Sequence, residues 1–366
     1  MTRKRIALYL PLGDKRMPWG GLGGADKRLS YLISHMDSRK FDVKIIFRIF
    51  EAPNRIVAAL EKYISKSCGV IFVYSDIEAF KHFYREKYDY LLYDDCMVKT
   101  IPGVLGAILG GSHRILIFVT ASYASWKFNK KWYSLIMYFN GILSNKIDCL
   151  YPTAKKILER IFKQKNVSIT PCSLPFLNKY LTFGRNAQKE RVIVFAGRLI
   201  EAKNPMSLIE TARILRNDLE NANYRVLICG AGPLEGAIKD YINQNNLHSV
   251  VRFLGPQNMF DILPKARIFC SLQKRENYPS QSLLEAIACG CYCIATNVGN
   301  TKALIKESFG TLINNDMEEL KNALLYAISL FDKEHEKILK SATEFAEKNF
   351  NPEKAIQHYE VLCTNL

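Results

Sequence analysis

The same alternation of short apolar runs and amphipathic helical patterns occurs in both halves of the chain, and it restricts the possible folds more than any other feature. The first half opens with an apolar run at 6–10, a glycine-rich loop at 20–24 and a helical pattern at 25–36. Its other strand-like runs are 43–47, 70–73, 90–92 and 115–119. Strands that alternate with helices in this way pair in parallel, because each crossover passes through a helix. The first half is therefore predicted to be an α/β domain with a parallel sheet.

The alternation restarts after a polar stretch at 185–191, which we interpret as an interdomain linker. The strand-like runs of the second half are 192–195, 224–229, 251–253, 268–271 and 292–295, and its helical patterns are 205–215, 234–245 and 282–289. A chain of 366 residues is long enough for two domains, each with its own core. We therefore expect two α/β domains, followed by a helical end with a break near 351–352.

The first half carries the whole excess of positive charge. Residues 1–185 contain 30 Lys and Arg against 14 Asp and Glu, whereas the remaining residues contain 21 of each. Such a half is expected to face an anionic partner: lipid head groups, nucleic acid or a phosphorylated substrate. The segment 123–146 mixes aromatic side chains with Lys127, Lys130, Lys131 and Lys146. It suits a helix lying on an anionic membrane surface, or an ordinary helix with aromatic core positions and solvated lysines.

Targeting signals and metal motifs are weak. No apolar run approaches the roughly 20 residues needed to span a bilayer. The basic-then-apolar start contains Pro11 and lacks a small-residue cleavage site, so we interpret it as a first strand. Cys289, Cys291 and Cys293 alternate like small residues on a buried strand, without a second Cys/His pair at zinc spacing. We expect reduced thiols and a cytoplasmic location.

Two glycine loops fall at predicted strand-to-helix junctions, one in each half. Gly23 and Gly24 end the first loop, and Gly230 and Gly232 lie in the second. The N–H groups at a helix N-terminus favour a phosphate, and glycine lets the phosphate approach the backbone. Neither loop has the spacing of the dinucleotide fingerprint, so a plain tight turn remains an equal alternative for each.

Two further segments follow predicted strands, at the sheet edge where open α/β folds bind ligands. In the first, Arg198 and Lys203 could both contact one diphosphate, or they could be solvated basic residues on a loop. In the second, Glu285 could accept hydrogen bonds from ribose hydroxyls. Alternatively, it is the capping-box glutamate of a helix that begins near Ser282. The loop before that helix would present Glu276 and backbone N–H groups to a sugar.

As a set, these motifs resemble retaining glycosyltransferases of family 4, which have the GT-B fold. The matching elements are Gly197-Arg198-Leu199 with Lys203-Asn204-Pro205, Gly230-Ala231-Gly232-Pro233, Leu283-Leu284-Glu285-Ala286 with Cys289-Gly290, Asn297-Val298-Gly299-Asn300, and the opening Gly23–Leu29. The resemblance is dense over 190–310 and sparse over 1–185. It implies two facing Rossmann-like domains with parallel sheets, 1–185 for the acceptor and 186–345 for the nucleotide sugar. The last part, 346–366, would be a helix that packs back on the N-terminal domain.

The resemblance also implies roles for single residues. Arg198 and Lys203 would bind the donor diphosphate and stabilise the charge of the leaving group. Glu285 would bind the ribose hydroxyls, and Gly24 would let the backbone of the first domain approach the phosphate or the sugar. The other donor-binding candidates are Gly23, Gly197, Gly230, Gly232, Tyr278, Pro279, Ser280 and Leu284.

Two departures from the family pattern leave the sugar contacts open. The family places two glutamates eight positions apart, but the residue eight before Glu285 is Asn277. Either Asn277 substitutes as the catalytic residue, or a one-residue shift lets Glu276 serve. The family often has a histidine after a strand like 115–119, and residues 120–123 contain none. Asp94 and Asp95 do not form an Asp-x-Asp motif, so we expect no cofactor and no essential metal.

The resemblance implies that a sugar moves, with retention, from a nucleoside-diphosphate sugar to a hydroxyl acceptor. The donor would be a UDP-sugar, and the acceptor lipid-linked or a polysaccharide, as in bacterial cell-surface polysaccharide or lipopolysaccharide biosynthesis. The enzyme would be cytoplasmic and peripheral on the inner face of the membrane. The alternatives are an epimerase of sugar nucleotides or a phosphorylase with the same fold, and a basic nucleic-acid-binding protein. No recognised nucleic-acid motif supports the last, so nucleic acid is not an expected partner.

Overall fold

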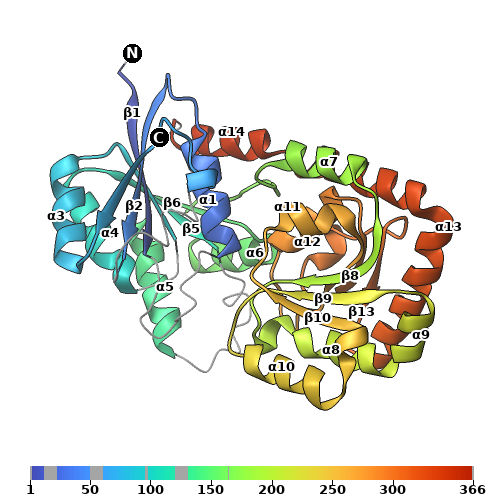
Figure 1. Cartoon of the computed structure of the whole chain (residues 1–366). Coiled ribbons are helices and arrows are strands. Elements are labelled where there is room, and N and C mark those ends of the chain that lie inside the picture. Colours follow the sequence, from blue (N-terminus) through green and yellow to red (C-terminus); the bar gives the residue numbers. More distant parts are fainter. Residues whose placement is uncertain are drawn as a thin grey trace. The chain divides into compact units, whose positions relative to one another are not determined.

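The chain divides into two compact units in the computed structural model. The model describes residues 2–11, 23–49, 61–94, 98–119, 131–163 and 165–364. The first unit comprises Met1–Pro175 and Pro352–Leu366, and the second comprises Phe176–Asn351. In Figure 1, each unit contains a sheet with helices packed on it.

The first unit is built on seven parallel strands in the order β3-β2-β1-β4-β5-β6-β7. The strands are β1 Lys4–Pro11, β2 Phe41–Arg48, β3 Gly69–Val73, β4 Tyr90–Asp94, β5 His113–Phe118, β6 Lys146–Cys149 and β7 Val167–Ile169. The helices are α1 Gly24–Ser34, α3 Asp76–Glu86, α4 Ile101–Leu109, α5 Lys131–Leu143, α6 Pro152–Ile161 and α14 Pro352–Leu362. The strand order reverses between β1 and β4, which is the doubly wound pattern of a Rossmann-like sheet.

The second unit repeats this design with six parallel strands in the order β10-β9-β8-β11-β12-β13. The strands are β8 Glu190–Ala196, β9 Arg225–Cys229, β10 Val251–Gly255, β11 Ala266–Ser271, β12 Tyr292–Thr296 and β13 Gly310–Ile313. The helices are α7 Leu177–Asn186, α8 Pro205–Ile214, α9 Arg216–Asn221, α10 Glu235–Gln244, α11 Met259–Ile262, α12 Gln281–Ala288 and α13 Met317–Asn349. Its strand order reverses between β8 and β11, so the carboxyl ends of these two strands mark the expected ligand edge.

The stretch at 185–191 that the sequence analysis interprets as a linker is the end of α7 and the start of β8. Helix α7 belongs to the second unit because its inner face packs there. Tyr180 stacks on Phe260 with 4.2 Å between ring centroids. A Cβ atom on Gly184 would fall 2.6 Å from the backbone of Cys289, so this glycine allows α7 to approach the end of α12 closely. The change of unit therefore falls at Pro175 and Phe176.

The predicted return of the last helix to the N-terminal part is confirmed. Helix α13 continues through Asn349, and α14 then begins with Pro352, which suits the first turn of a helix. Helix α14 lies against α1 in the first unit (Figure 1). The backbone N–H of Asp37 donates to the Glu360 carboxylate at 2.7 Å, which adds a polar contact to this packing.

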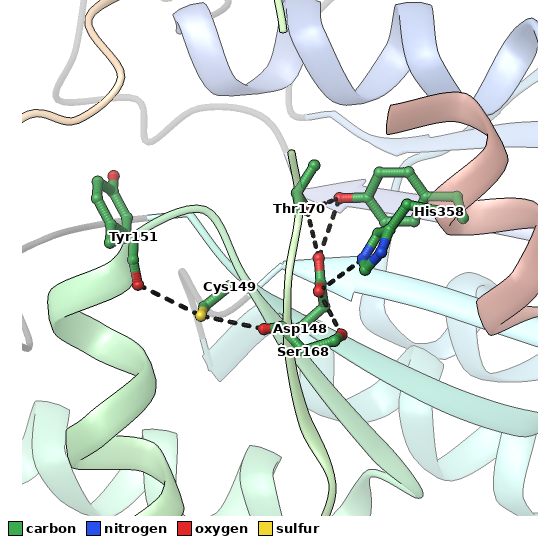
Figure 2. A network of polar contacts seen from close by, with 7 residues as sticks. Asp148, Cys149, Tyr151, Ser168, Thr170 and His358 are labelled. Carbon is green, nitrogen blue, oxygen red and sulfur yellow. Dashed lines mark hydrogen bonds and ion pairs between the residues drawn. The ribbon is translucent and has the colours of Figure 1, made fainter. Parts of the chain in front are cut away.

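A buried carboxylate ties α14 to the sheet of the first unit (Figure 2). Asp148 on β6 is completely buried and accepts hydrogen bonds from Ser168 Oγ and Thr170 Oγ1. His358 Nε2 lies 2.9 Å from Asp148 Oδ1, and Tyr359 Oη lies 2.7 Å from Thr170 Oγ1. Because a carboxylate only accepts, the donors on Ser168, Thr170 and His358 each satisfy part of a charge that would otherwise be costly to bury.

Candidate functional site

The loops that follow β8 and β9 pack directly on each other at the carboxyl edge of the second sheet. The N–H of Gly197 donates to Cys229 O at 3.1 Å, and the N–H of Leu199 donates to Ala231 O at 3.0 Å. Gly230 has a φ of +137°, and a Cβ atom there would fall 1.9 Å from Gly197 O. A Cβ atom on Gly232 would fall 2.4 Å from Leu199 O. The structure thus gives both glycines a packing function, and their contact with a donor stays a prediction.

Arg198 and Lys203 both lie just beyond the end of β8. Arg198 is exposed, whereas Lys203 is half-buried. A Cβ atom added to Gly197, the neighbour of Arg198, would meet no atom of the described residues within 4 Å. In the part of the chain that the structure describes, neither cation forms an ion pair with Asp or Glu. Two neighbouring positive charges are therefore held at the ligand edge without a carboxylate between them.

Lys203 is the last residue of a short 3₁₀ turn, η4 Glu201–Lys203, which fixes its main chain. The backbone N–H of Lys274 donates to Ala202 O at 3.0 Å, and the Lys274 side chain pairs with Glu201 at 3.3 Å. Asn204 follows in the left-handed conformation with φ 55°. Its Nδ2 donates to Ser207 Oγ at 2.8 Å, and Pro205 then starts α8. The turn is thus anchored on both sides, which gives Lys203 a defined position.

The ammonium group of Lys203 has one neutral partner. Its Nζ donates to Gln273 Oε1 at 3.0 Å. Burial and, to a smaller extent, the nearby charge of Arg198 together lower the pKa of Lys203 to about 7. An anion bound at this place would raise the pKa of Lys203 again, because its negative charge stabilises the protonated lysine.

Glu276 joins the loop after β11 to the turn at 297–300. Its Oε1 accepts a hydrogen bond from the backbone N–H of Asn300 at 2.9 Å. Gly299 has a φ of +54°, and a Cβ atom there would fall 2.2 Å from Glu276 Cδ, so only glycine fits this approach. Asn277, Tyr278 and Pro279 are half-buried in the same loop. The structure therefore places Glu276, the shifted position, against the turn at 297–300, which is one of the segments that resemble the family.

The capping interpretation of Glu285 is wrong. Helix α12 begins at Gln281 with Ser280 as its N-cap, so the capping-box position is Leu283 and Glu285 lies two residues beyond it. The Glu285 carboxylate is buried and accepts a hydrogen bond from Gln281 Nε2 at 3.1 Å. Leu284 is completely buried, which gives its side chain a packing function in α12, and its contact with a donor stays a prediction.

The candidates of the first unit are described only in part. Gly23 is the N-cap of α1, and Gly24 is its first residue. The N–H of Gly23 donates to the Asp26 carboxylate at 2.7 Å, so this residue already has an anionic partner. The rest of the loop at 20–22, Asp95, residues 120–123 and most of the aromatic and lysine segment, 123–130, lie outside the described residues.

The cysteine cluster agrees with its structural interpretation. Cys289, Cys291 and Cys293 are buried free thiols, and burial raises the pKa of each. Among the described residues, no group of three or more His, Cys, Asp or Glu side chains could hold a metal ion. Nor does any described helix combine the length and apolar character that crossing a membrane requires.

Sequence reasoning missed Gln273, Ser271 and Thr296. Gln273 is buried, its Nε2 donates to Ser271 Oγ at 3.2 Å, and its main-chain oxygen accepts from Thr296 Oγ1 at 2.6 Å. None of the three belongs to a motif described above. The available signal was position alone, because they sit at or just after the carboxyl ends of β11 and β12.

Two Rossmann-like units, each with a parallel sheet, are the architecture of the GT-B fold. The model matches the crystal structure of Anabaena Alr3699/HepE in complex with UDP and glucose, with a TM-score of 0.75 over 99% of each chain. The sequence identity is 13%, so this similarity concerns the fold.

The second half of the chain matches a family model. Residues 181–345 of the 366 match the model of the glycosyl transferases group 1 family. The predicted resemblance to this family is confirmed over this segment, and the predicted fold is confirmed as well.

Two curated bacterial relatives are similar over parts of the chain. The N-acetylgalactosamine-N,N'-diacetylbacillosaminyl-diphospho-undecaprenol 4-alpha-N-acetylgalactosaminyltransferase of Campylobacter jejuni is 28% identical over 49% of this chain and 50% of its own. The UDP-Gal:alpha-D-GlcNAc-diphosphoundecaprenol alpha-1,3-galactosyltransferase of Escherichia coli is 26% identical over 68% of each chain. The chain thus spans about half the length of the first relative.

Proposed function

We propose that this protein transfers a sugar, with retention, from a nucleoside-diphosphate sugar to a hydroxyl group of a lipid-linked acceptor. The observation that carries the proposal is the pair of cations, Arg198 and Lys203, at the carboxyl edge of β8 within the segment that matches the family. Their charges have no carboxylate partner among the described residues, and a diphosphate supplies two negative charges.

In this proposal, the two cations stabilise the leaving diphosphate. Negative charge on the diphosphate grows as the glycosidic bond breaks, so a fixed cation lowers the energy of the transition state more than that of the bound donor. The leaving phosphate itself takes up the proton of the acceptor hydroxyl. Because Arg198 and Lys203 supply positive charge, we propose that no metal ion is essential. Full activity in the presence of EDTA would support this, and loss of activity that Mg²⁺ restores would contradict it.

Two carboxylates complete the proposed donor site. Glu285, buried in α12 one turn past its start, would accept hydrogen bonds from the ribose hydroxyls. Glu276 would contact the transferred sugar, supported by its place against the turn at Gly299 and Asn300. Asn277 remains the alternative residue for this contact.

The names of the relatives support a UDP-sugar donor and an acceptor carried on diphosphoundecaprenol. The Escherichia coli relative uses UDP-Gal, and both relatives act on diphosphoundecaprenol-linked sugars. Which sugar this chain transfers is tested by a panel of nucleotide sugars in thermal unfolding. A bound donor at 100 times its Kd adds about 2.7 kcal/mol of stability.

Acceptor-dependent release of the nucleoside diphosphate distinguishes the proposed transfer from its rivals. We expect UDP release only when a polyprenyl-diphosphate-linked sugar is added. Conversion of the sugar nucleotide without an acceptor would indicate an epimerase instead. A salt-sensitive gel shift with no response to any nucleotide sugar would indicate a nucleic-acid-binding protein.

We further propose that the first unit binds an anionic membrane surface through α5. Leu135, Tyr138, Phe139 and Ile142 follow helical spacing on one face, and each is 46–50% exposed. The alternative in which these aromatics are core residues therefore does not hold for Tyr138 and Phe139. An apolar helix face in a half that carries the whole net charge of +16 suits an interface with anionic lipid.

Co-sedimentation with vesicles of anionic phospholipid tests this surface. A Tyr138→Ser, Phe139→Ser variant and a variant with Lys127, Lys130, Lys131 and Lys146 changed to Glu should both sediment less than the wild type. Each basic residue near such a surface contributes about 1 kcal/mol, and added salt should weaken the attachment. Tyr326→Ser, an exposed aromatic of the second unit, is the matched control. Equal sedimentation of all variants would contradict the membrane proposal.

A further inference from the structure

The partner of Lys203 is unusual for an ammonium group that is partly buried. Lys203 Nζ donates to the side-chain oxygen of Gln273 at 3.0 Å. A carboxylate in this place would neutralise the lysine, whereas an amide oxygen orients it and leaves its charge intact. Gln273 has the shape of glutamate, so the difference between the two is almost purely electrostatic.

Gln273 is itself held on three sides. It is 6% exposed, and its Nε2 donates to Ser271 Oγ at 3.2 Å. Its main-chain oxygen accepts from the buried Thr296 hydroxyl at 2.6 Å. With Nε2 used by Ser271, the amide oxygen is the atom that faces Lys203. The hydrogen bonds to Ser271 and Thr296 therefore fix the position of the Gln273 side chain, and they turn its amide oxygen towards Lys203.

The charged groups around Lys203 leave its charge uncompensated. Arg198 is a second cation, and its proximity and burial together lower the pKa of Lys203 to about 7. Glu201, the nearest acidic residue in the turn, pairs with Lys274 at 3.3 Å. Across the residues that the structure describes, Lys203 forms no ion pair with either Asp or Glu.

We propose that Gln273 is a positioning residue of the donor site, and that a nucleoside-diphosphate sugar binds there together with one proton. This inference rests on the proposed function, because it assigns the diphosphate to Arg198 and Lys203. Above neutral pH the free lysine is largely deprotonated, and the bound diphosphate stabilises its protonated form. Binding then takes a proton from solution, so the affinity for the donor falls as the pH rises.

The test uses the full chain and UDP-glucose, whose diphosphate diester keeps the same charge between pH 6 and pH 9. Calorimetry in two buffers of different ionisation enthalpy should show an uptake of about 0.9 proton at pH 8 and about 0.1 at pH 6. The Kd should be about tenfold higher at pH 8 than at pH 6. Equal Kd values and no proton uptake at the two pH values would contradict proton-linked binding, whereas the role of Gln273 is tested by variants.

Two variants separate the residues involved. Gln273→Glu places a carboxylate beside Lys203, so the lysine stays protonated at both pH values. The pH dependence should disappear, and binding at pH 6 should weaken about tenfold because the carboxylate competes with the diphosphate. Lys203→Arg keeps a charge that does not titrate, and it should also bind without pH dependence. Gln257→Glu, an exposed glutamine of the same unit that bonds to Leu254 O, is the matched control and should behave as the wild type.

The outcomes distinguish this inference from the function on which it rests. Binding of UDP-glucose with equal affinity at pH 6 and pH 8, or a full pH dependence in Lys203→Arg, would overturn the inference and leave the proposed donor site standing. Failure of the wild type to bind UDP-glucose at any pH would overturn the proposed uridine donor and this inference together.

Discussion

The two units treat a charge inside the protein in opposite ways. In the first unit, Asp148 is completely buried, and hydrogen bonds from Ser168, Thr170 and His358 satisfy its carboxylate. In the second unit, Lys203 is partly buried next to another cation, and its side-chain partner among the described residues is the neutral amide of Gln273.

The difference separates a charge that serves the fold from a charge that serves a ligand. A buried group whose hydrogen bonds are complete stabilises the arrangement of its donors, and here it connects β6, β7 and α14. A group whose charge is incomplete costs stability, and such a cost persists at binding sites because the ligand removes it. Removing each charge should therefore have opposite consequences for folding.

The largest effect is expected at the satisfied charge. Asp148→Ala removes the common acceptor of three side chains and leaves buried donors unpaired, so it should lower the free energy of unfolding by about 3–5 kcal/mol. Urea unfolding monitored by circular dichroism measures this loss. The folded fraction should bind the donor with an unchanged Kd.

The control for Asp148 is an acidic residue of the same sheet with an ordinary surface partner. Asp42 on β2 lies 3.7 Å from Lys44, and both side chains are about one third exposed. Asp42→Ala should change stability by no more than about 0.5 kcal/mol. Equal losses in the two variants would show that the network around Asp148 has no special role in the fold.

The next largest effect is expected on the catalytic rate when one of the two unpaired cations is removed. Arg198→Ala and Lys203→Ala should each lower kcat by about 10²–10³-fold, equivalent to about 2.7–4 kcal/mol, because each removes a cation from the leaving diphosphate. Steady-state kinetics with saturating acceptor measures this. If kcat stays normal and only KM rises, the two residues bind the donor without stabilising the transition state.

Sequence patterns predicted most of the helices and strands of the two units. They failed where contacts between residues far apart in the chain determine the structure. Strong apolar runs indicated β1 and β8, but β6 was missed because it has four residues, two of them Lys146 and Asp148. The stretch around Arg185 looked like a linker because its packing through Gly184 depends on Cys289, far away in the chain.

The site shows the same limit. Motif spacing selected Arg198, Lys203 and Glu285 as candidates, and it left Glu276 and Asn277 as alternatives. The hydrogen bond between Glu276 and the N–H of Asn300 could not be predicted, because it depends on a glycine turn whose position no local pattern gives. The proposed role of Gln273 could not be predicted from the sequence for a related reason. It depends on the side-chain oxygen that the fold places beside Lys203.

Glu285→Gln should have a smaller effect than loss of a cation. The amide keeps the size of the side chain but removes a charged acceptor, and a hydrogen bond to a charged group contributes about 1.5–3 kcal/mol. We expect kcat/KM at limiting donor to fall about 10–100-fold while the melting temperature stays within a few degrees. Near-normal kcat/KM would remove the ribose assignment, and a strong loss of stability would show that Glu285 is needed for packing.

The smallest expected effect is a gain in stability on removing the charge of Lys203. It tests the comparison most directly, because removal of the Asp148 charge should lower stability. Lys203→Met replaces the partly buried ammonium with an apolar chain of similar length and should raise the stability of the donor-free protein by about 1 kcal/mol. The pKa of Lys203 is lowered to about 7 in the folded state from its ordinary value of 10.5, so folding the protonated form has a cost. That cost is complete below pH 7 and disappears as the pH rises towards 10.5, because the native state then binds fewer protons than the unfolded state. The gain from Lys203→Met should accordingly be larger at pH 6 than at pH 9 in urea unfolding, whereas Lys239→Met, on an exposed lysine of α10 paired with Glu235, should show no such trend. A loss of stability in Lys203→Met at pH 6 would mean that the lysine supports the fold as Asp148 does.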